Sequence, residues 1–425
     1  MSYSEENDVA LQTRLFKVTS KERRRNLCAL CRGHRRLCGK TVCPILTKAE
    51  TLMKLEEGLS SEKVFGSSPP AVFVGSWGYP KVLAGPLVPP ISAADTSIMD
   101  MPEMWLDRSF DEILRYRLTL VRGKHPTRVE SARKPSRLLS TFQEVVMAST
   151  PTDTEMWFDK KPNLSVIFSP REPPSGPSAS VRRAFLTENP RVPRVVEKVV
   201  SDTDLKSVQG IWRLYDSDLS QRQITRMLSI GLLGLKRSRR LVPTEWSITA
   251  VDDVLGKAIH KEVLDYPWIN EFKVFGHKAL GNNVQLLLLP SSWVFEAQEA
   301  WLTSRNPTPG VDYELLSGRR SYAKDLEGAY YAARLPVLEY LRRVRRQAGA
   351  VVFMEVYPDW IPLGVWRFRE ICREALRKEP KKFNTLEEAL NELRTRLKLP
   401  LDRWMKRSKV LRWYKDQTRL TRFLA

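Results

Sequence analysis

Val284-Gln285-Leu286-Leu287-Leu288-Leu289 and Val351-Val352-Phe353-Met354-Glu355-Val356-Tyr357 are two short, nearly continuous apolar runs. Runs of this length and composition predict β-strands. Both are too apolar for a sheet with one face in water, so we expect helices on both sides of the sheet. The sequence therefore predicts an α/β fold of the mixed α+β kind, a body of buried strands covered by helices.

The residues that follow the second run supply candidate cover helices. Residues 365–376 carry an apolar stripe at the spacing of an amphipathic helix, formed by Phe368, Ile371, Cys372 and Ala375. A second helix is predicted to begin at the capping box Thr385-x-x-Glu388 and to be ended by Pro400. Earlier in the chain, we expect helices over 48–57 and 211–235 and a buried strand over 71–74.

The composition indicates a globular protein with a polyanionic partner. Hydrophobic residues make up 42% of the 425 residues, enough for sizeable cores. Lysine and arginine number 70 against 49 acidic residues, a formal net charge of +21, which favours nucleic acid because neutralised phosphates release counterions. The sequence has no run of about 20 apolar residues and no signal-peptide pattern. We therefore expect a soluble, cytoplasmic protein with no membrane partner.

Four of the five cysteines lie close together, as Cys28-x2-Cys31-x6-Cys38-x4-Cys43. Four thiolates at this spacing favour a structural Zn²⁺ site, because four protein ligands leave no open position for catalysis. An iron–sulfur cluster uses the same donors and stays open as an alternative. Two disulfides are disfavoured, since nothing else in the chain indicates an oxidising compartment. The sequence thus predicts a small N-terminal zinc module.

Basic residues surround the cysteine cluster and recur in a second run further along the chain. Both sets are predicted to contact nucleic-acid phosphates, and a solvated basic surface that only stabilises the fold is the alternative. The residues are Arg23, Arg24, Arg25, Arg32, Arg35 and Arg36 beside the cysteines, and Lys236, Arg237, Arg239 and Arg240 in the second run.

A glycine-rich turn, Gly75-Ser76-Trp77-Gly78-Tyr79-Pro80, follows the strand predicted over 71–74. Such a turn can bring backbone N–H groups close to an anion. It lacks the Gly-Lys-Ser/Thr of a Walker loop, so a structural turn is the simpler interpretation. We nevertheless expect Ser76 and Lys81 near any ligand pocket, with Thr249 and Asp252 as further candidates.

The last residues of the chain carry Gln417, Leu420, Phe423 and Leu424 at i, i+3, i+6 and i+7. In a short helical turn these side chains share one side, and a peptide this short cannot bury three apolar groups by itself. The spacing resembles the clamp-binding peptide (PIP motif) of replication and repair proteins, which implies a groove on a sliding clamp. A terminal helix that docks on its own domain is the alternative.

An ordered series of segments makes the chain similar to the archaeal Nre family of NreA-type DNA repair proteins. Besides the cysteine cluster and the terminal peptide, the segments are 75–80, 85–86, 160–162, 173–177, 187–190, 241–244, 246–250 and 362–366. The resemblance implies a factor in DNA damage repair whose four-cysteine site is a zinc finger. It also implies that the terminal peptide recruits the protein to the archaeal PCNA-type clamp at DNA, in the cytoplasm with the nucleoid.

With this resemblance, four parts are expected along the chain. They are an N-terminal leader with the four-cysteine zinc module (1–47), an Nre N-terminal region with a proline-rich connector (48–195), an Nre C-terminal region (196–400) and a basic tail with the clamp-binding peptide (401–425).

The sequence leaves open whether the body is an enzyme, because no catalytic motif is present. Glu355 at a strand end, joined by Asp252 or Asp253, would supply ligands for Mg²⁺ in a metal-dependent nuclease. Three acids within about 5 Å would favour that reaction. The turn at 75–81 with Thr249 and Asp252 would instead form a nucleotide pocket. A second alternative is an RNA- or ribosome-associated zinc-ribbon protein, which would have no use for the terminal peptide.

Overall fold

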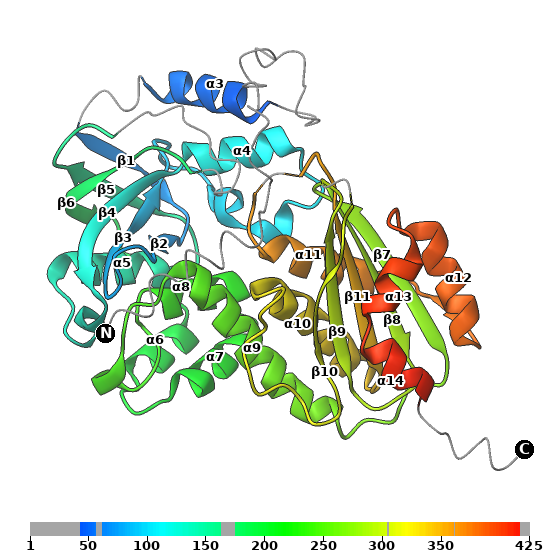
Figure 1. Ribbon diagram of the computed structural model, residues 1–425. Coiled ribbons are helices and arrows are strands. Elements are labelled where there is room, and N and C mark those ends of the chain that lie inside the picture. The colour runs from blue at the N-terminus through cyan, green and yellow to red at the C-terminus, as the bar shows by residue number, and fades with distance from the viewer. Residues whose placement is uncertain (1–42, 57–61, 163–174, 304–305, 361, 417–425) are drawn as a thin grey trace, which may run out of the picture.

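Two six-stranded sheets form the framework of the computed structural model (Figure 1). The structure describes residues 43–56, 62–162, 175–303, 306–360 and 362–416. The strands of the first sheet are β1 (Lys63–Ser68), β2 (Val72–Val74), β3 (Lys81–Val88), β4 (Val121–Arg128), β5 (Thr152–Phe158) and β6 (Ser178–Leu186). Those of the second are β7 (Phe272–Ala279), β8 (Asn282–Leu289), β9 (Phe295–Trp301), β10 (Gly310–Glu314), β11 (Gly349–Val356) and β12 (Lys381–Phe383).

The two apolar runs of the sequence form neighbouring strands inside the second sheet, whose order is β10-β9-β11-β8-β7-β12. β11 pairs antiparallel with β8, which places Val351 opposite Leu287, and it pairs parallel with β9. Every residue of β8 and β11 is buried. The strands predicted from the two runs are therefore confirmed.

Helices cover both faces of the second sheet, as predicted (Figure 1). One face carries α10 (Gly328–Val344) and α11 (Trp366–Arg377), and the other carries α12 (Leu386–Arg396), α13 (Leu401–Arg407) and α14 (Val410–Asp416). Successive strand residues point to opposite faces. Leu286 and Leu288 accordingly join the core on the α10 side, whereas Leu287 and Leu289 pack with α12–α14. Both faces of the strands are apolar because both are covered.

The helices predicted after β11 are also present. The stripe of Phe368, Ile371, Cys372 and Ala375 in α11 is fully buried, and Thr385 and Glu388 form the predicted capping box of α12. α12 ends at Arg396, and Pro400 instead stands at the N-cap of α13. Most of the stretch expected as a basic tail therefore folds, since α13 and α14 together close the outer face of the second sheet.

The first sheet has the order β1-β5-β6-β4-β3-β2, with antiparallel neighbours except for the parallel pair β4 and β6. β6 occupies the middle of this sheet, although it belongs to residues 160–195, the proline-rich connector at the end of the region expected over 48–195. Residues 178–186 of that segment contain no proline, so every position there can take part in a ladder.

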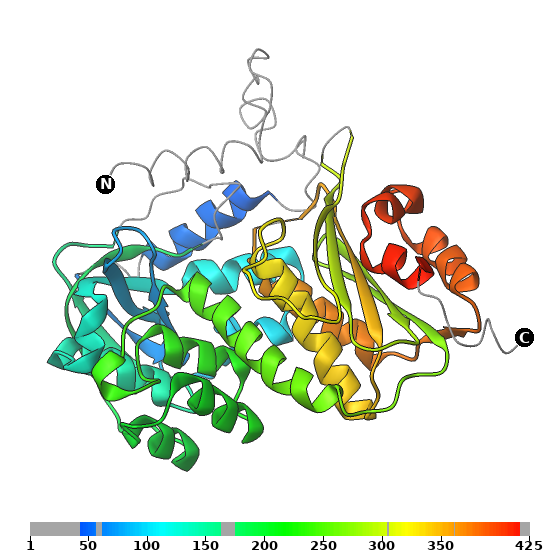
Figure 2. The ribbon, with the colours of Figure 1, turned by 60° about the horizontal axis from the view of Figure 1, so that its bottom comes forward.

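Helices from both halves of the chain join the two sheets around a shared core, which runs from Val64 of β1 to Leu376 of α11. Figure 2 shows α9 (green) lying beside α10 (gold) between the sheets. The remaining helices are α3 (Pro44–Glu56), α4 (Phe110–Thr119), α5 (Arg137–Met147), α6 (Arg194–Ser201), α7 (Ser207–Asp216), α8 (Gln221–Ser229) and α9 (Thr244–Val263), with the 3₁₀ turns η1 (Ser97–Asp100), η2 (Pro102–Met104), η3 (Val129–Arg133) and η4 (Lys236–Ser238).

The single helix predicted over 211–235 is wrong, because this stretch contains the end of α7, a turn and α8. Asp218 in the turn has a φ of 60°, a left-handed conformation that a continuing helix cannot contain. The chain leaves the helix again after Ser229, where Gly231 and Gly234 have φ values of 76° and 104°. The apolar residues of this stretch do face the core, so their periodicity spans two helices that pack on the same side.

Candidate nucleic-acid interface

The glycine-rich turn between β2 and β3 presents aromatic side chains to solvent. The Tyr79 N–H donates to Ser76 O at 3.2 Å and the Lys81 N–H donates to Gly78 O at 2.9 Å. Gly78 has a φ of 81°, and a Cβ there would lie 2.8 Å from Lys81 O, so the turn requires glycine. The turn leaves Trp77 88% exposed, which is unusual for the largest apolar side chain.

Two segments from distant parts of the sequence lie beside this turn. Lys81 is opposite Arg128 in the β3–β4 ladder, and the Val129 N–H donates to Pro80 O at 3.0 Å. On the other side of Val129, its carbonyl accepts from the Leu241 N–H at 2.9 Å. η3 therefore lies next to η4, and the basic run after α8 is brought to the glycine-rich turn.

The start of α9 completes this surface with a third aromatic residue. The rings of Trp246 and Tyr79 are 5.3 Å apart, and both side chains are nearly half exposed. Behind the turn, the Arg122 guanidinium lies 3.8 Å from the centre of the Phe73 ring. Burial lowers the pKa of Arg122 to about 10, so it stays charged at neutral pH.

We name this region the aromatic–basic surface and define it by its exposed members. They are Trp77, Tyr79 and Trp246 together with Lys81, Arg128, Arg133, Lys134, Lys236, Arg237 and Arg240. Two acids, Glu130 and Glu245, belong to the same segments, so positive charge predominates. Exposed aromatic rings among cations suit single-stranded nucleic acid, whose bases stack while its phosphates pair with lysine and arginine.

The structure separates the four basic residues that the sequence grouped after α8. Lys236, Arg237 and Arg240 are exposed on the aromatic–basic surface. Arg239 is buried, and its guanidinium donates to Gly234 O at 2.9 Å and Val200 O at 2.8 Å. Arg239 thus holds the η4 loop in place, and the other three are left for a partner.

The four residues expected around a ligand pocket also separate. Ser76 and Lys81 lie in the glycine-rich turn, whereas Thr249, further along α9, contacts Tyr322 and lies close to Gly328. Asp252 is buried and accepts from Arg369 Nη1 at 2.8 Å and from Gln221. No contact described for Asp252 is with the turn.

Two predicted sites lie outside the described residues. Of the four cysteines, Cys43 alone is described; it is half-buried and directly precedes α3. Cys28, Cys31 and Cys38 precede the described chain, with the basic residues Arg23, Arg24, Arg25, Arg32, Arg35 and Arg36. Gln417, Leu420, Phe423 and Leu424 follow α14, which ends at Asp416.

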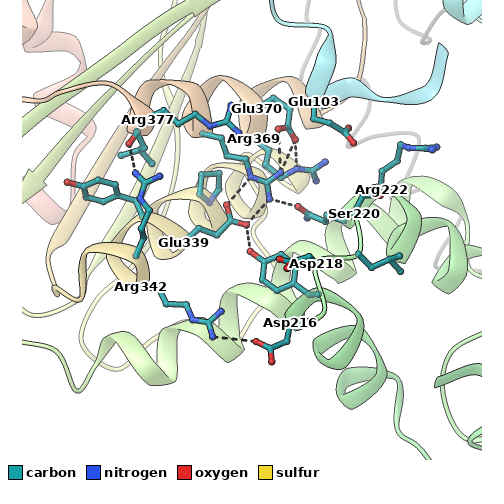
Figure 3. A pocket seen from close by; sticks show the side chains of 18 residues that line it. Glu103, Asp216, Asp218, Ser220, Arg222, Glu339, Arg342, Arg369, Glu370 and Arg377 are labelled. Carbon is teal, nitrogen blue, oxygen red and sulfur yellow. Dashed lines mark hydrogen bonds and ion pairs between the residues drawn. The ribbon is translucent and has the colours of Figure 1, made fainter. Parts of the chain in front are cut away.

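A second, deeper feature is a cavity of about 650 Å³ between α7, α8, α10 and α11 (Figure 3). Six arginines and five acidic residues line it: Arg222, Arg342, Arg343, Arg369, Arg373 and Arg377, and Glu103, Asp216, Asp218, Glu339 and Glu370. The near balance of charge distinguishes this cavity from the aromatic–basic surface.

The arginines of this cavity bond to groups of the protein itself. Arg373 donates to Glu339 at 2.7 Å and to Glu370 at 3.1 Å, and Tyr215 Oη donates to Glu339 at 2.8 Å. Burial alone would raise the pKa of Glu339, but the Arg373 guanidinium outweighs it and holds this pKa below the usual range. Arg342 pairs with Asp216, as the dashed lines of Figure 3 show. These bonds tie the helices together and leave little capacity for a ligand.

The acids proposed for a nuclease site do not converge. Glu355 accepts from the backbone N–H groups of Lys398 and Leu399 at 2.8 and 2.7 Å, and its other oxygen accepts from Asn283 and Tyr357. Asp253 pairs with Lys257 at 2.6 Å. Throughout the part of the chain that the structure describes, no group of three or more histidine, cysteine, aspartate or glutamate residues could hold a metal ion.

The sequence missed several members of the aromatic–basic surface. Trp77 and Tyr79 stand in a turn rich in glycine and proline, and aromatic residues in such a turn have no strand or helix that could bury them. The position of these aromatic residues in the turn was the signal from which the sequence could have predicted their exposure. Arg128, Arg133 and Lys134 carried no local signal, because they join the surface only through strand pairing and the contact of η3 with η4.

Known proteins place the chain in a family. The family models described as Archaeal Nre, N-terminal and Archaeal Nre, C-terminal match residues 37–305 and 314–423. The chain belongs to the archaeal Nre family, as the resemblance in the sequence implied. No solved structure matches it.

The relatives are similar over nearly their whole length. The chain is 39% identical to the DNA repair protein NreB of Archaeoglobus fulgidus, over 92% of this chain and 98% of the relative. It is 38% identical to the DNA repair protein NreA of the same organism, over 85% and 92%. It is 34% identical to the DNA repair protein NreA of Haloferax volcanii, over 84% and 89%. No helix of the described chain is long and apolar enough to cross a membrane.

Proposed function

We propose that this protein is a DNA repair factor that binds DNA through its basic body and zinc finger and is recruited to a sliding clamp by its C-terminal peptide. The observation that carries the repair role is the similarity to relatives named DNA repair proteins over 84–92% of this chain. Binding to DNA is supported by the aromatic–basic surface and the net charge of +21. We place this activity in the cytoplasm, at the nucleoid.

The zinc finger belongs to the proposal through its chemistry. Four thiolates at 28, 31, 38 and 43 make a closed structural Zn²⁺ site, and Cys43 directly precedes α3. The six arginines at 23–36 would then extend the basic area of the body with a second, metal-stabilised contact to phosphates.

Replacing Trp77 by alanine is expected to weaken binding of single-stranded DNA about 5- to 150-fold, the equivalent of about 1–3 kcal/mol for one stacked base. Because Trp77 is 88% exposed, the free energy of unfolding should not change. Fluorescence anisotropy with a labelled oligonucleotide, at several salt concentrations, measures the effect. An unchanged affinity would remove the turn from the interface.

The control is Trp268→Ala, which also removes an exposed tryptophan. Trp268 follows the C-terminal end of α9, whereas Trp246 lies near its start. A helix of 20 residues is about 30 Å long, so the control removes an aromatic ring well away from the aromatic–basic surface and should leave DNA affinity unchanged.

Replacing Phe423 by alanine is expected to weaken binding to the sliding clamp by about 2 kcal/mol, roughly 30-fold, because an aromatic anchor in a groove is a typical hot spot. Isothermal titration calorimetry of the full chain with the clamp measures it. Thr421→Ala changes a side chain on the opposite side of the expected turn and should bind like the wild type. Clamp affinity that survives both Phe423→Ala and deletion of 417–425 would contradict recruitment through this peptide. A wild-type chain that does not bind the clamp would favour the RNA- or ribosome-associated alternative.

A further inference from the structure

A cavity of about 360 Å³ lies between α9, α10 and the loop that follows β10. It is separate from the arginine-rich cavity of Figure 3 and shares no lining residue with it. Its inner wall comes from His260 of α9, from Tyr330 and Arg334 of α10, and from Glu314 at the end of β10. Its size falls within the range of small-molecule sites.

Three polar atoms of this wall have no hydrogen-bond partner among the residues that the structure describes. They are His260 Nε2, Tyr330 Oη and Arg334 Nη1, and each is inaccessible to solvent. The whole Tyr330 side chain is 1% exposed and Arg334 is 5% exposed. Leaving a buried polar atom unpaired costs about 1–3 kcal/mol. The residues that carry these three atoms line one cavity, so a ligand that the side chains shift to meet would supply the missing partners.

The protein fixes the position of the Arg334 guanidinium while leaving one nitrogen unused. Arg334 Nε donates to Glu314 Oε1 at 2.7 Å, and the same oxygen accepts from Trp293 Nε1 at 2.6 Å. On the neighbouring helix, a Cβ at Gly256 would lie 2.8 Å from Arg334 Nη1. The missing side chain at Gly256 therefore lets Nη1 pack closely against α9.

The charge state of the wall favours an oxyanion. Burial, reinforced by Glu314, raises the pKa of Tyr330 well above its usual value, so its hydroxyl keeps its proton and can donate. Burial and the nearby Arg334 lower the pKa of His260, so at neutral pH its ring is uncharged and one nitrogen can donate. The charge of Arg334 is paired with that of Glu314, but four basic residues line the cavity against the two acids Asp253 and Glu314. The three inner groups can therefore donate to the oxygens of a phosphate in a wall with an excess of basic residues.

The outer part of the cavity offers a surface for a planar ring. Tyr322 is 53% exposed, and its ring is stacked on that of Tyr331 at 5.4 Å and 29°. Arg319 and Arg320 line the same rim. Arg319 is engaged with Asp312 at 2.7 Å, and Arg320 contributes a further positive charge.

We propose that this cavity binds a nucleoside phosphate, with the phosphate held by Tyr330, Arg334 and His260 and the base stacked on Tyr322. The nucleoside phosphate belongs either to a free nucleotide or to the 5′-phosphorylated end of a DNA strand. The cavity includes no residue of the aromatic–basic surface or of the clamp peptide, so nucleotide binding can be tested independently of the proposed function.

The test is isothermal titration calorimetry of the full chain with dAMP, deoxyadenosine and inorganic phosphate. Binding of dAMP at least 10-fold tighter than either part alone is expected. Tyr330→Phe removes one hydroxyl that donates to a charged group, and should weaken dAMP binding about 10- to 100-fold. Because that hydroxyl has no hydrogen-bond partner in the described part of the chain, the variant's thermal stability should not fall.

Gly256→Ala provides an independent variant, because the added Cβ would lie 2.8 Å from Arg334 Nη1 and would displace the guanidinium from its position. Alanine is the better helix former at this position of α9, so the variant should fold, and its dAMP affinity should drop. Tyr313→Phe is the control, since Tyr313 is partly exposed and alternates with Glu314 along β10. Wild-type affinity in both Tyr330→Phe and Gly256→Ala, or no dAMP binding at millimolar concentration, would overturn the site.

Two further arms identify the ligand. Oligonucleotides that differ only in carrying a 5′-phosphate or a 5′-hydroxyl distinguish a strand end from a free nucleotide as the ligand. Binding that Tyr330→Phe weakens is binding in the cavity. Inorganic phosphate that binds as tightly as dAMP would overturn the stacking of a base on Tyr322.

Discussion

Replacement of Asp100 by asparagine is expected to lower the free energy of unfolding by about 3–5 kcal/mol, because it leaves buried cations without their counterion. Asp100 has no exposed surface, and its oxygens pair with Arg222 at 2.5 Å, Arg226 at 3.0 Å and Arg117 at 3.7 Å. Asparagine preserves the shape of the side chain and removes only the charge. Urea unfolding followed by circular dichroism measures the loss.

The effect of Asp100 should also depend on pH. Burial alone would raise the pKa of Asp100, but Arg226, Arg222 and Arg117 outweigh it and hold this pKa below the usual range. A carboxyl whose pKa is lowered in the folded state stabilises the protein above its unfolded pKa of about 4 and loses that contribution as pH falls through the folded pKa. The stability difference between wild type and Asp100→Asn should be full at pH 7 and shrink below about pH 4.

Asp402→Asn is the matched control. The Asp402 side chain is 88% exposed and lies 3.8 Å from Arg394, a surface pair whose typical contribution is about 0–1 kcal/mol. A loss for Asp100→Asn no larger than that of the control would show that the three arginines do not depend on this carboxylate.

Replacement of Trp404 by alanine is expected to cost about 3–5 kcal/mol, as for other large core side chains. Trp404 has no exposed surface and contacts Phe353 of β11 edge-on, with ring centres 5.6 Å apart. Its Nε1 donates to Leu399 O at 3.3 Å. The residue belongs to the stretch after Pro400, which forms α13 and α14 over the second sheet. Unfolding of the variant in urea tests whether this stretch carries stability.

Trp413→Ala is the comparison on the next helix. Trp413 is only partly buried against the same core, so its loss should destabilise the protein clearly less than the loss of Trp404. Equal and small effects from both would mean that α13 and α14 contribute little to the fold. In the expected case, α14 ends one residue before Gln417, and the proposed clamp peptide would follow a firmly packed helix.

The buried strands and the helices that follow them could be predicted because their signals are local. An apolar run such as 284–289 is recognisable without knowing its partner, and the capping box of Thr385 and Glu388 involves residues three positions apart. The prediction of a single helix over 211–235 was wrong because the feature that interrupts it is not a local one. Its apolar periodicity was real, but the left-handed turn at Asp218 depends on how two helices meet.

The candidate sites depended much more on tertiary contacts. Arg239 looked like its neighbours in the sequence, and only its bonds to backbone carbonyls separate it from the exposed cations. Asp100 and its partner Arg226 are 126 residues apart. Arg334 left a faint signal, a charged residue among the apolar positions of α10, but nothing near it in the sequence pointed to His260.

Residue type and spacing along the chain were therefore sufficient for the α/β architecture, the covered strands and the family, since hydrophobic periodicity, caps and motifs act over a few residues. The aromatic–basic surface and the cavity of His260, Tyr330 and Arg334 exist only in the folded chain. Strand pairing joins Lys81 to Arg128, and the packing of α9 on α10 sets His260 beside Arg334. These residues become neighbours because folding buries the shared core, and the contacts of that core join segments that are far apart in the sequence.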